Sequence, residues 1–314
     1  MADRAAFRAQ EVCRRDREMH IVQRKHEPTD KAAVVLELVR NTACERVAVR
    51  QVKLGVVDAP LFDFEEVFDG DYLYFYGLRL DEGDHEADAV WRLLELKPGM
   101  EVLDLACGHG RIANRLAERG ARVCGLDATP LFVERARDDA AARRVEVEYL
   151  DGDMRCLPWP DGRFDRVLLW FTSFGYFDDL DNRRVLREAR RSLRPGGRLL
   201  IETNNLAELL PRWLPSVVIE RDGDLMIDRL SFAPTTGRAT TERTVLRDGR
   251  MRRFHFSVRM FIAAELRDWL LDAGFTSVKF CDHDGEPLTA HSRRMVTIAS
   301  LQTAPAQAAC LGER

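Results

Sequence analysis

The sequence predicts an α/β protein with a doubly wound, mostly parallel seven-stranded sheet, an N-terminal helical segment and an inserted antiparallel flap. From about residue 99 to 203, short apolar runs alternate with helical patterns, which is typical of a parallel sheet covered by helices. Residues 217–261 then carry two Asp-Gly pairs flanked by strand patterns, which predict two hairpins. Strand patterns at 275–281 and 293–301 add an antiparallel end to the sheet.

The predicted elements follow in order along the chain. Residues 1–30 are charged with a helical pattern, 31–54 carry apolar positions at helical spacing, and 60–80 are acidic and aromatic, so 1–80 is predicted to form a cap. Residues 81–314 are predicted to form the catalytic domain, with 217–261 as a substrate-side flap. Within that domain, strands are predicted at 100–106, 121–127, 145–153, 164–171 and 198–204. Helices are predicted at 110–120, after Thr129-Pro130, at 182–197 and at 263–274.

Composition narrows the classes of function. The 48 basic and 52 acidic residues give a net charge of −4, without the basic patch of a nucleic-acid-binding protein. No apolar run approaches the ~20 residues of a membrane span. Seven cysteines without a CxxC pair, and an N-terminus without an apolar signal core, indicate a reduced, cytoplasmic protein. Cys281, His283 and His291 lack the spacing of metal ligands, so no metal is expected.

The segment from Val102 to Gly110 is the strongest candidate for a nucleotide site. It runs from a strand through a glycine turn into a helix, and Gly108 and Gly110 allow close approach of a ligand. Asp127 ends the next strand, where a carboxylate accepts hydrogen bonds from ribose hydroxyls. Asp153 and Met154 end the third strand and are placed to hold an adenine. A nicotinamide enzyme is the competing interpretation, although Ala113 occupies the place of the third glycine.

These motifs together resemble the class I S-adenosylmethionine-dependent methyltransferases. The matching stretches are VLDLACGHGRIANRLAERG, VCGLDATPLFVERAR, YLDGDMRCLPWPDGRFDRVLLWFTSFGYF and LREARRSLRPGGRLLIET, which together cover about residues 99–203. The resemblance implies S-adenosylmethionine as cofactor, with its methionine and ribose end against Asp104, Ala106, Gly108 and Gly110. It further implies that Asp127 contacts the ribose, Asp153 and Met154 the adenine, and Trp170 or Phe171 the methionine side. Ala128 and Tyr76 complete the predicted cofactor set. More loosely, the chain resembles the small-molecule, natural-product branch of the family.

The acceptor site is predicted from three other segments, which are the tyrosine-rich stretch 71–76, the stretch 172–177 after the fourth strand, and the flap. Tyr176, just past a strand end, is the leading acceptor contact. Glu220, Arg243 and His255 of the flap are further candidates, because alternation turns one face of each flap strand toward the domain. Glu45, in the N-terminal segment, is the last candidate.

The sequence therefore predicts methyl transfer to a small polar metabolite, at an amine or a hydroxyl, in bacterial natural-product biosynthesis. No Asn-Pro-Pro-Tyr/Phe follows the fourth strand, so the signature of DNA and protein-amide methyltransferases is absent. Two alternatives stay open: elimination or cyclisation on the same fold, with Glu45, Glu220 or His255 as base, and a non-catalytic partner subunit. The expected partner is a small molecule rather than nucleic acid or membrane, with a homo-oligomer or a partner subunit as further options.

Overall fold

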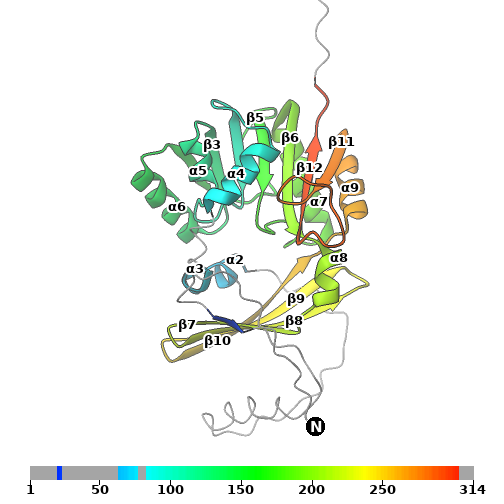
Figure 1. The fold of residues 1–314 in the computed structure, drawn as a ribbon. Helices are drawn as coiled ribbons and strands as arrows, with labels where there is room; N and C mark the ends of the chain where they lie inside the picture. Colours follow the sequence, from blue (N-terminus) through cyan, green and yellow to red (C-terminus); the bar gives the residue numbers. More distant parts are fainter. Residues whose placement is uncertain (1–19, 23–62, 77–82, 304–314) are drawn as a thin grey trace, which may run out of the picture.

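A computed structural model describes residues 20–22, 63–76 and 83–303, arranged around two sheets (Figure 1). The larger sheet has seven strands in the order β11-β12-β6-β5-β2-β3-β4. Their bounds are β2 (Glu101–Leu105), β3 (Arg122–Asp127), β4 (Val147–Asp151), β5 (Phe164–Leu169), β6 (Leu193–Asn204), β11 (Ser277–Cys281) and β12 (Arg294–Ser300). Only β12 runs antiparallel to its neighbours, β6 and β11. The predicted mostly parallel seven-stranded sheet is confirmed.

Helices cover both faces of this sheet. On one face, α4 (Gly83–Leu93), α5 (Ala113–Glu118) and α6 (Pro130–Arg143) pack on a core that includes Val102. On the other face, α7 (Asp179–Ser192) and α9 (Ala263–Asp272) pack on a core that includes Leu103. Successive residues of β2 thus enter opposite cores, as the alternation of side chains along a strand requires. The sheet is doubly wound, as predicted.

The flap is a separate antiparallel sheet in the order β1-β7-β8-β9-β10. Its strands are β1 (His20–Val22), β7 (Ser216–Arg221), β8 (Asp224–Ala233), β9 (Arg238–Arg247) and β10 (Arg250–Arg259). Asp222, Gly223, Asp248 and Gly249 have φ of 52°, 89°, 51° and 71°, the positive values that two-residue hairpin turns of this type require. Both predicted hairpins are confirmed.

The helical pattern predicted for residues 1–30 is wrong at 20–22, the part of that stretch which the structure describes. These residues form β1, which pairs antiparallel with β7. The free edge of a sheet offers hydrogen-bonding partners that a local sequence pattern does not register. The predicted helical segment 31–54 lies outside the described residues.

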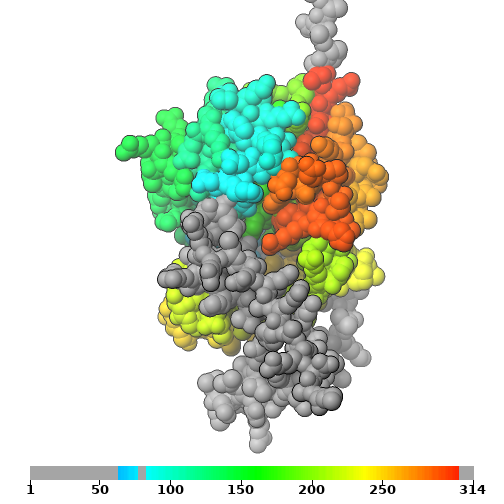
Figure 2. Space-filling model, viewed as in Figure 1, coloured from blue at the N-terminus to red at the C-terminus, as the bar shows by residue number. Residues whose placement is uncertain are grey.

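Two short helices, α2 (Phe64–Val67) and α3 (Gly70–Tyr76), lie between the catalytic domain and the flap (Figure 1). Asp63 caps α2 by accepting hydrogen bonds from the backbone of Glu65 and Glu66. A further turn, α8 (Leu206–Leu209) and η2 (Leu210–Arg212), leads from β6 toward the flap. In the space-filling view, the visible parts of the flap, drawn in yellow, lie below the catalytic domain (Figure 2). The flap thus lies opposite one end of the parallel sheet.

Two simple features of the described residues bear on earlier predictions. The four cysteines among them, Cys107, Cys124, Cys156 and Cys281, are free. None of the helices in this part of the chain is long and apolar enough to cross a membrane.

Candidate active site

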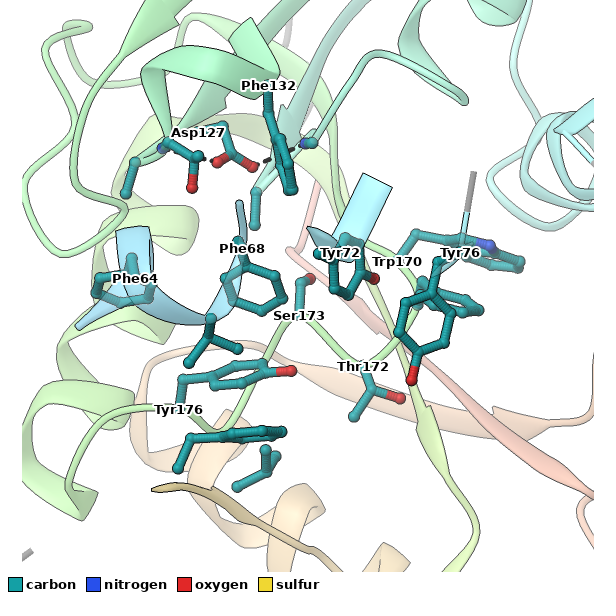
Figure 3. Close-up of a pocket in the computed structure, with 18 of the residues that line it drawn as sticks. Phe64, Phe68, Tyr72, Tyr76, Asp127, Phe132, Trp170, Thr172, Ser173 and Tyr176 are labelled. Carbon is teal, nitrogen blue, oxygen red and sulfur yellow. Dashed lines mark hydrogen bonds between the residues drawn. The ribbon is translucent and has the colours of Figure 1, made fainter. Parts of the chain in front are cut away.

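One cavity of about 670 Å³ joins the carboxyl ends of the parallel strands to the inner face of the flap. Figure 3 shows Asp127 at one end, Tyr176 at the other, and Phe68 and Tyr72 between them. We call the part lined by the strand ends the cofactor half. The part lined by α2, α3, the loop after β5 and the flap is the acceptor half.

The glycine turn after β2 forms the floor of the cofactor half. Ala106 and Gly108 line the cavity and have φ of 53° and 55°. The amide of Gly108 donates to Oδ2 of Asp127 (2.8 Å), and the amide of Thr129 donates to Oδ1 of the same carboxylate (2.9 Å). Asp127 is 8% exposed, lines the cavity and keeps further lone pairs on both oxygens. The turn and the carboxylate therefore hold each other in place, while the carboxylate still accepts from a ligand.

Gly110 lies behind this turn rather than among the residues that line the cavity. Its φ is 80°, and a Cβ there would stand 2.5 Å from the hydroxyl oxygen of Tyr149 and 2.9 Å from Cβ of Ala136. Tyr149 in turn donates to Oδ1 of the buried Asn114 (2.6 Å). Gly108 therefore lines the cavity where the close approach of a ligand is predicted, whereas Gly110 allows the helix to pack closely on the sheet.

Asp104 contributes a buried carboxyl group with an unusual pKa. It is 3% exposed and lines the cavity. Burial, together with the nearby Asp127, raises the pKa of Asp104 to about 8, and burial also raises the pKa of Asp127. A pair of buried carboxyl groups facing one cavity favours a ligand that carries positive charge.

The end of β4 supplies the predicted adenine contacts. Met154 is 9% exposed, and it lines the cavity together with Asp153 and Ala128. Arg155 pairs with Asp153 (2.7 Å) and with Asp181 (2.5 Å). Partial burial acts to raise the pKa of Asp153, but the hydrogen bonds from Arg155 outweigh it and lower that pKa. Asp153 is therefore ionised and fixed in position at neutral pH.

The loop after β5 is held in a strained conformation. Phe171 and Thr172 have φ of 60° and 57°, values that non-glycine residues rarely adopt. The buried Glu202 of β6 accepts from the amide of Phe171 (2.8 Å) through its carboxylate and from the amide of Thr172 (3.0 Å) through its backbone carbonyl. Arg294 of β12 bridges Glu202 Oε2 and the Thr172 hydroxyl, both at 2.6 Å. The network fixes the loop that carries Ser173 and Tyr176.

Trp170 precedes this loop and lines the cavity, as predicted. Its ring stacks on His283, with centroids 5.1 Å apart and planes inclined by 21°. His283 also bonds to Glu202 at 2.8 Å, so it belongs to the same network. No local pattern singles out Glu202 or Arg294 in the sequence, because their partners lie far away along the chain.

Aromatic rings from α3 and from Phe68, which follows α2, lie at the boundary between the two halves of the cavity. Phe68 contacts the rings of Tyr72 (5.2 Å), Tyr176 (5.5 Å) and Phe132 of α6 (6.2 Å). Tyr72 packs on Tyr76 at 4.7 Å. Burial raises the pKa of Tyr176 to about 12. The predicted residues Tyr76 and Tyr176 both reach the cavity, and Tyr176 keeps its proton at neutral pH.

One of the three flap candidates also reaches the cavity. Arg243 of β9 is 5% exposed and lines it. Its Nε and Nη2 donate to Oδ1 and Oδ2 of Asp228 on β8, both at 2.7 Å. The Nη2 also lies 3.4 Å from the hydroxyl oxygen of Tyr76. The role of Asp228 was not predicted, because its importance depends on the strand register that sets it opposite Arg243.

The structure does not bring His255 or Glu220 into the cavity. On β10, Phe254, Phe256 and Val258 are buried, so His255 points to the opposite, exposed face, where it bonds to Glu242 at 3.2 Å. On β7 the inner position belongs to Ile219, and Glu220 is exposed. Their prediction as catalytic residues therefore fails on geometry. Glu45 lies outside the described residues.

With this geometry in place, comparisons with known proteins identify the domain. Residues 102–197 match the family model described as a methyltransferase domain. The chain is 41% identical over 122 residues to a demethylmenaquinone methyltransferase of Thermus thermophilus, covering 37% of this chain and 54% of that protein. It is 39% identical over 133 residues to the corresponding enzyme of Thermotoga maritima, covering 40% and 52%. Residues 102–197 are a methyltransferase domain by this match, and the predicted resemblance of the chain to the class I S-adenosylmethionine-dependent methyltransferases is confirmed.

The cofactor of this methyltransferase domain is S-adenosylmethionine. The chain spans about half the length of the curated relatives it matches. Solved structures share the fold: the CcbJ methyltransferase of Streptomyces caelestis has a TM-score of 0.60 at 24% identity and covers 71% of this chain and 90% of its own. A sugar N-methyltransferase from Streptoalloteichus sp. has a TM-score of 0.57 at 23% identity, with coverage of 83% and 98%. The match to the family model ends before the flap, so the acceptor half has to be interpreted from its own residues.

Proposed function

We propose that this methyltransferase transfers the methyl group of S-adenosylmethionine to a hydroxyl or amine of a small molecule held between the catalytic domain and the flap. The observation that carries the proposal is the single cavity, which runs without a break from the glycine turn to the flap. A volume of about 670 Å³ lies within the usual range for small-molecule sites. The relatives named above, a demethylmenaquinone methyltransferase and a sugar N-methyltransferase, also act on small molecules by their names.

The cofactor half fits S-adenosylmethionine in charge as well as in shape. The sulfonium and ammonium groups of the cofactor are cationic, and the buried Asp104 faces the cavity without an ion pair among the described residues. In the proposed arrangement Asp104, Ala106 and Trp170 lie at the methionine end. Asp127 accepts from the ribose hydroxyls, while Asp153, Met154 and Ala128 surround the adenine. Gly108 admits the ligand, and Gly110 and Tyr76 support the site from behind the turn and from the acceptor side.

Methyl transfer from a sulfonium needs an aligned acceptor more than it needs an activated donor. Among the described residues, the lining of the acceptor half contains no carboxylate and no imidazole. Tyr176 keeps its proton at neutral pH, so it orients the acceptor and does not remove its proton. This site therefore suits an acceptor that needs little base catalysis, such as a phenolic or enolic hydroxyl or a neutral amine.

The test is methyl transfer from S-adenosylmethionine carrying a deuterated methyl group, with a panel of phenols, enols and amines analysed by mass spectrometry. We expect a product heavier by the labelled methyl group and stoichiometric formation of S-adenosylhomocysteine. Conversion of an acceptor without consumption of S-adenosylmethionine would instead support elimination or cyclisation.

A further inference from the structure

The two faces of the flap sheet differ sharply in chemistry. The outer face carries Arg229, Glu242 and His255, and Glu242 pairs with Arg229 at 3.1 Å and with His255 at 3.2 Å. The inner face that lines the cavity is mainly apolar and includes Leu230, Ala239, Phe256 and Val258. A single ionised side chain from the flap strands, Arg243, lines the cavity among the described residues. The part of an acceptor that faces the flap must therefore present mostly apolar surface.

Arg243 is held rigidly in this apolar wall. Asp228 and Arg243 are directly opposite each other on β8 and β9 and are 8% and 5% exposed. The guanidinium group also lies over the ring of Phe256, 5.1 Å from its centroid, and 5.8 Å from the ring of Tyr76. Nε and Nη2 are used by Asp228, whereas Nη1 makes no hydrogen bond within the described part of the chain. Two N–H donors on Nη1 thus remain for a ligand.

The ion pair is not needed to account for the fold. A buried ion pair pays a large desolvation penalty, and apolar residues of similar volume often replace one without loss of stability. Around the pair the inner face is mainly apolar, with Thr241 as a further polar side chain in the lining. The pair therefore suggests a role in recognition.

We propose that Arg243 donates from Nη1 to an uncharged oxygen of the acceptor, a carbonyl or a hydroxyl, and that the rest of the acceptor is an apolar, ring-containing body against Leu230, Phe256 and Val258. Asp228 already neutralises the guanidinium group. A carboxylate or phosphate placed against Arg243 would consequently bury an uncompensated negative charge, and sugar hydroxyls placed against the apolar flap wall would be buried without partners. The proposal rests on the proposed function, because it assigns a substrate class to the same cavity.

The test uses the full chain saturated with S-adenosylhomocysteine, so that probes enter the acceptor half. The fluorescent probe is the uncharged dye N-phenyl-1-naphthylamine, and three competitors share one ring system: naphthalene, 2-acetylnaphthalene and 2-naphthoate. We expect 2-acetylnaphthalene to displace the dye at about tenfold lower concentration than naphthalene, as one hydrogen bond to a charged donor provides. We expect 2-naphthoate to be the weakest of the three. Equal or tighter binding of 2-naphthoate would overturn the proposal.

Variants of the pair make the test specific. Asp228→Asn leaves the guanidinium charge uncompensated, so 2-naphthoate should become the strongest competitor. The double variant Asp228→Leu/Arg243→Met removes both charges, so it avoids a buried orphan charge and should abolish the preference for the ketone over naphthalene. Arg229→Met, an arginine replacement on the outer face, is the matched control and should keep the original order. If the order survives in the double variant, Arg243 is not the anchor.

The binding competition and the methyl-transfer assay can fail independently of each other. Binding in the expected order without methyl transfer to any acceptor would contradict the reaction and leave the recognition intact. Methyl transfer to an acceptor, together with a binding order that does not depend on Arg243, would support the reaction and contradict the recognition.

Discussion

The two halves of the cavity are built on different principles. In the cofactor half, each functional group lies within a few residues of a strand end, and backbone amides fix it, as Gly108 and Thr129 fix Asp127. In the acceptor half, contacts join distant parts of the chain: Tyr76 and Arg243, which meet at 3.4 Å, are 167 residues apart. The first half is thus specified by short local motifs, and the second by strand register and by which face of a sheet turns inward.

This difference predicts that changes in the glycine turn act on the whole fold, whereas changes in the acceptor half act on binding. Gly110→Ala gives the largest effect that we expect. The new methyl group would meet Tyr149, Ala136 and Asn114 within 2.9 Å, at a φ of 80°. Backbone strain and overpacking together should lower the free energy of unfolding by about 2–4 kcal/mol. Chemical denaturation measures this quantity.

Gly99→Ala is the matched control. Gly99 has a φ of 85°, but an added Cβ meets nothing within 4 Å. This variant should lose only the part due to backbone strain, about 1 kcal/mol. Equal destabilisation by the two substitutions would show that close packing is not the role of Gly110.

Asp127→Ala tests the cofactor half directly. Removing a buried charged acceptor should weaken the binding of S-adenosylmethionine by about ten- to a hundredfold, or roughly 1.5–3 kcal/mol, in calorimetric titration. Asp161→Ala changes a carboxylate whose side chain is 81% exposed and should leave the affinity unaltered. Unchanged affinity in the Asp127 variant would remove this residue from the ribose site.

The sequence predicts the cofactor half better than the acceptor half. Asp104, Gly108, Asp127 and Met154 were all predicted to meet, because parallel strands bring their carboxyl ends to one edge. The flap was predicted from its Asp-Gly turns, but its inner face was not assigned correctly. The two-residue turn at 248–249 sets His255 opposite Glu242 and Phe254 opposite Arg243. Choosing the face that bears Phe254, Phe256 and Val258 as the inner one would have excluded His255.

Other parts of the site depend on contacts that no local pattern encodes. Glu202 and Arg294 support the loop after β5 only because β12 pairs with β6, where Val296 lies opposite Glu202. In the sequence, Asp228 is one of several polar residues that alternate along a predicted strand. Its burial becomes evident only once the register sets it opposite Arg243. Such pairs require the tertiary structure, since their spacing along the chain carries no signal.

The pH dependence of cofactor binding tests the ionisation of Asp104 in the cofactor half. In the free protein Asp104 has a pKa of about 8 and is protonated at neutral pH. A cationic ligand stabilises the ionised form, so binding releases a proton and affinity should rise with pH until about 8, then level off. We expect about a tenfold increase between pH 6.5 and 8, since each unit of pKa corresponds to about 1.4 kcal/mol.

Calorimetry in buffers with different ionisation enthalpies measures the released proton at pH 7. Asp104→Asn cannot ionise, so it should bind with little dependence on pH in this range and without the proton attributable to this carboxyl. A variant with the same pH dependence as the unaltered protein would place the titrating group elsewhere.

Tyr176→Phe should have the smallest effect and the most selective one. The variant keeps the ring that packs on Phe68 at 5.5 Å and removes only the hydroxyl. If that hydroxyl orients the acceptor, turnover should fall by about five- to tenfold while the affinity for S-adenosylmethionine stays the same. Because burial raises the pKa of Tyr176 to about 12, kcat should keep the same pH profile from 6 to 9 in both proteins.

Tyr74→Phe is the control variant. The Tyr74 hydroxyl donates to the Arg221 carbonyl at 3.1 Å, away from the cavity lining, so its loss should leave turnover intact. A fall in cofactor affinity equal to the fall in turnover would assign Tyr176 to the cofactor half. The loop after β5 would then belong to the cofactor half, and the acceptor half would be confined to the residues of the flap.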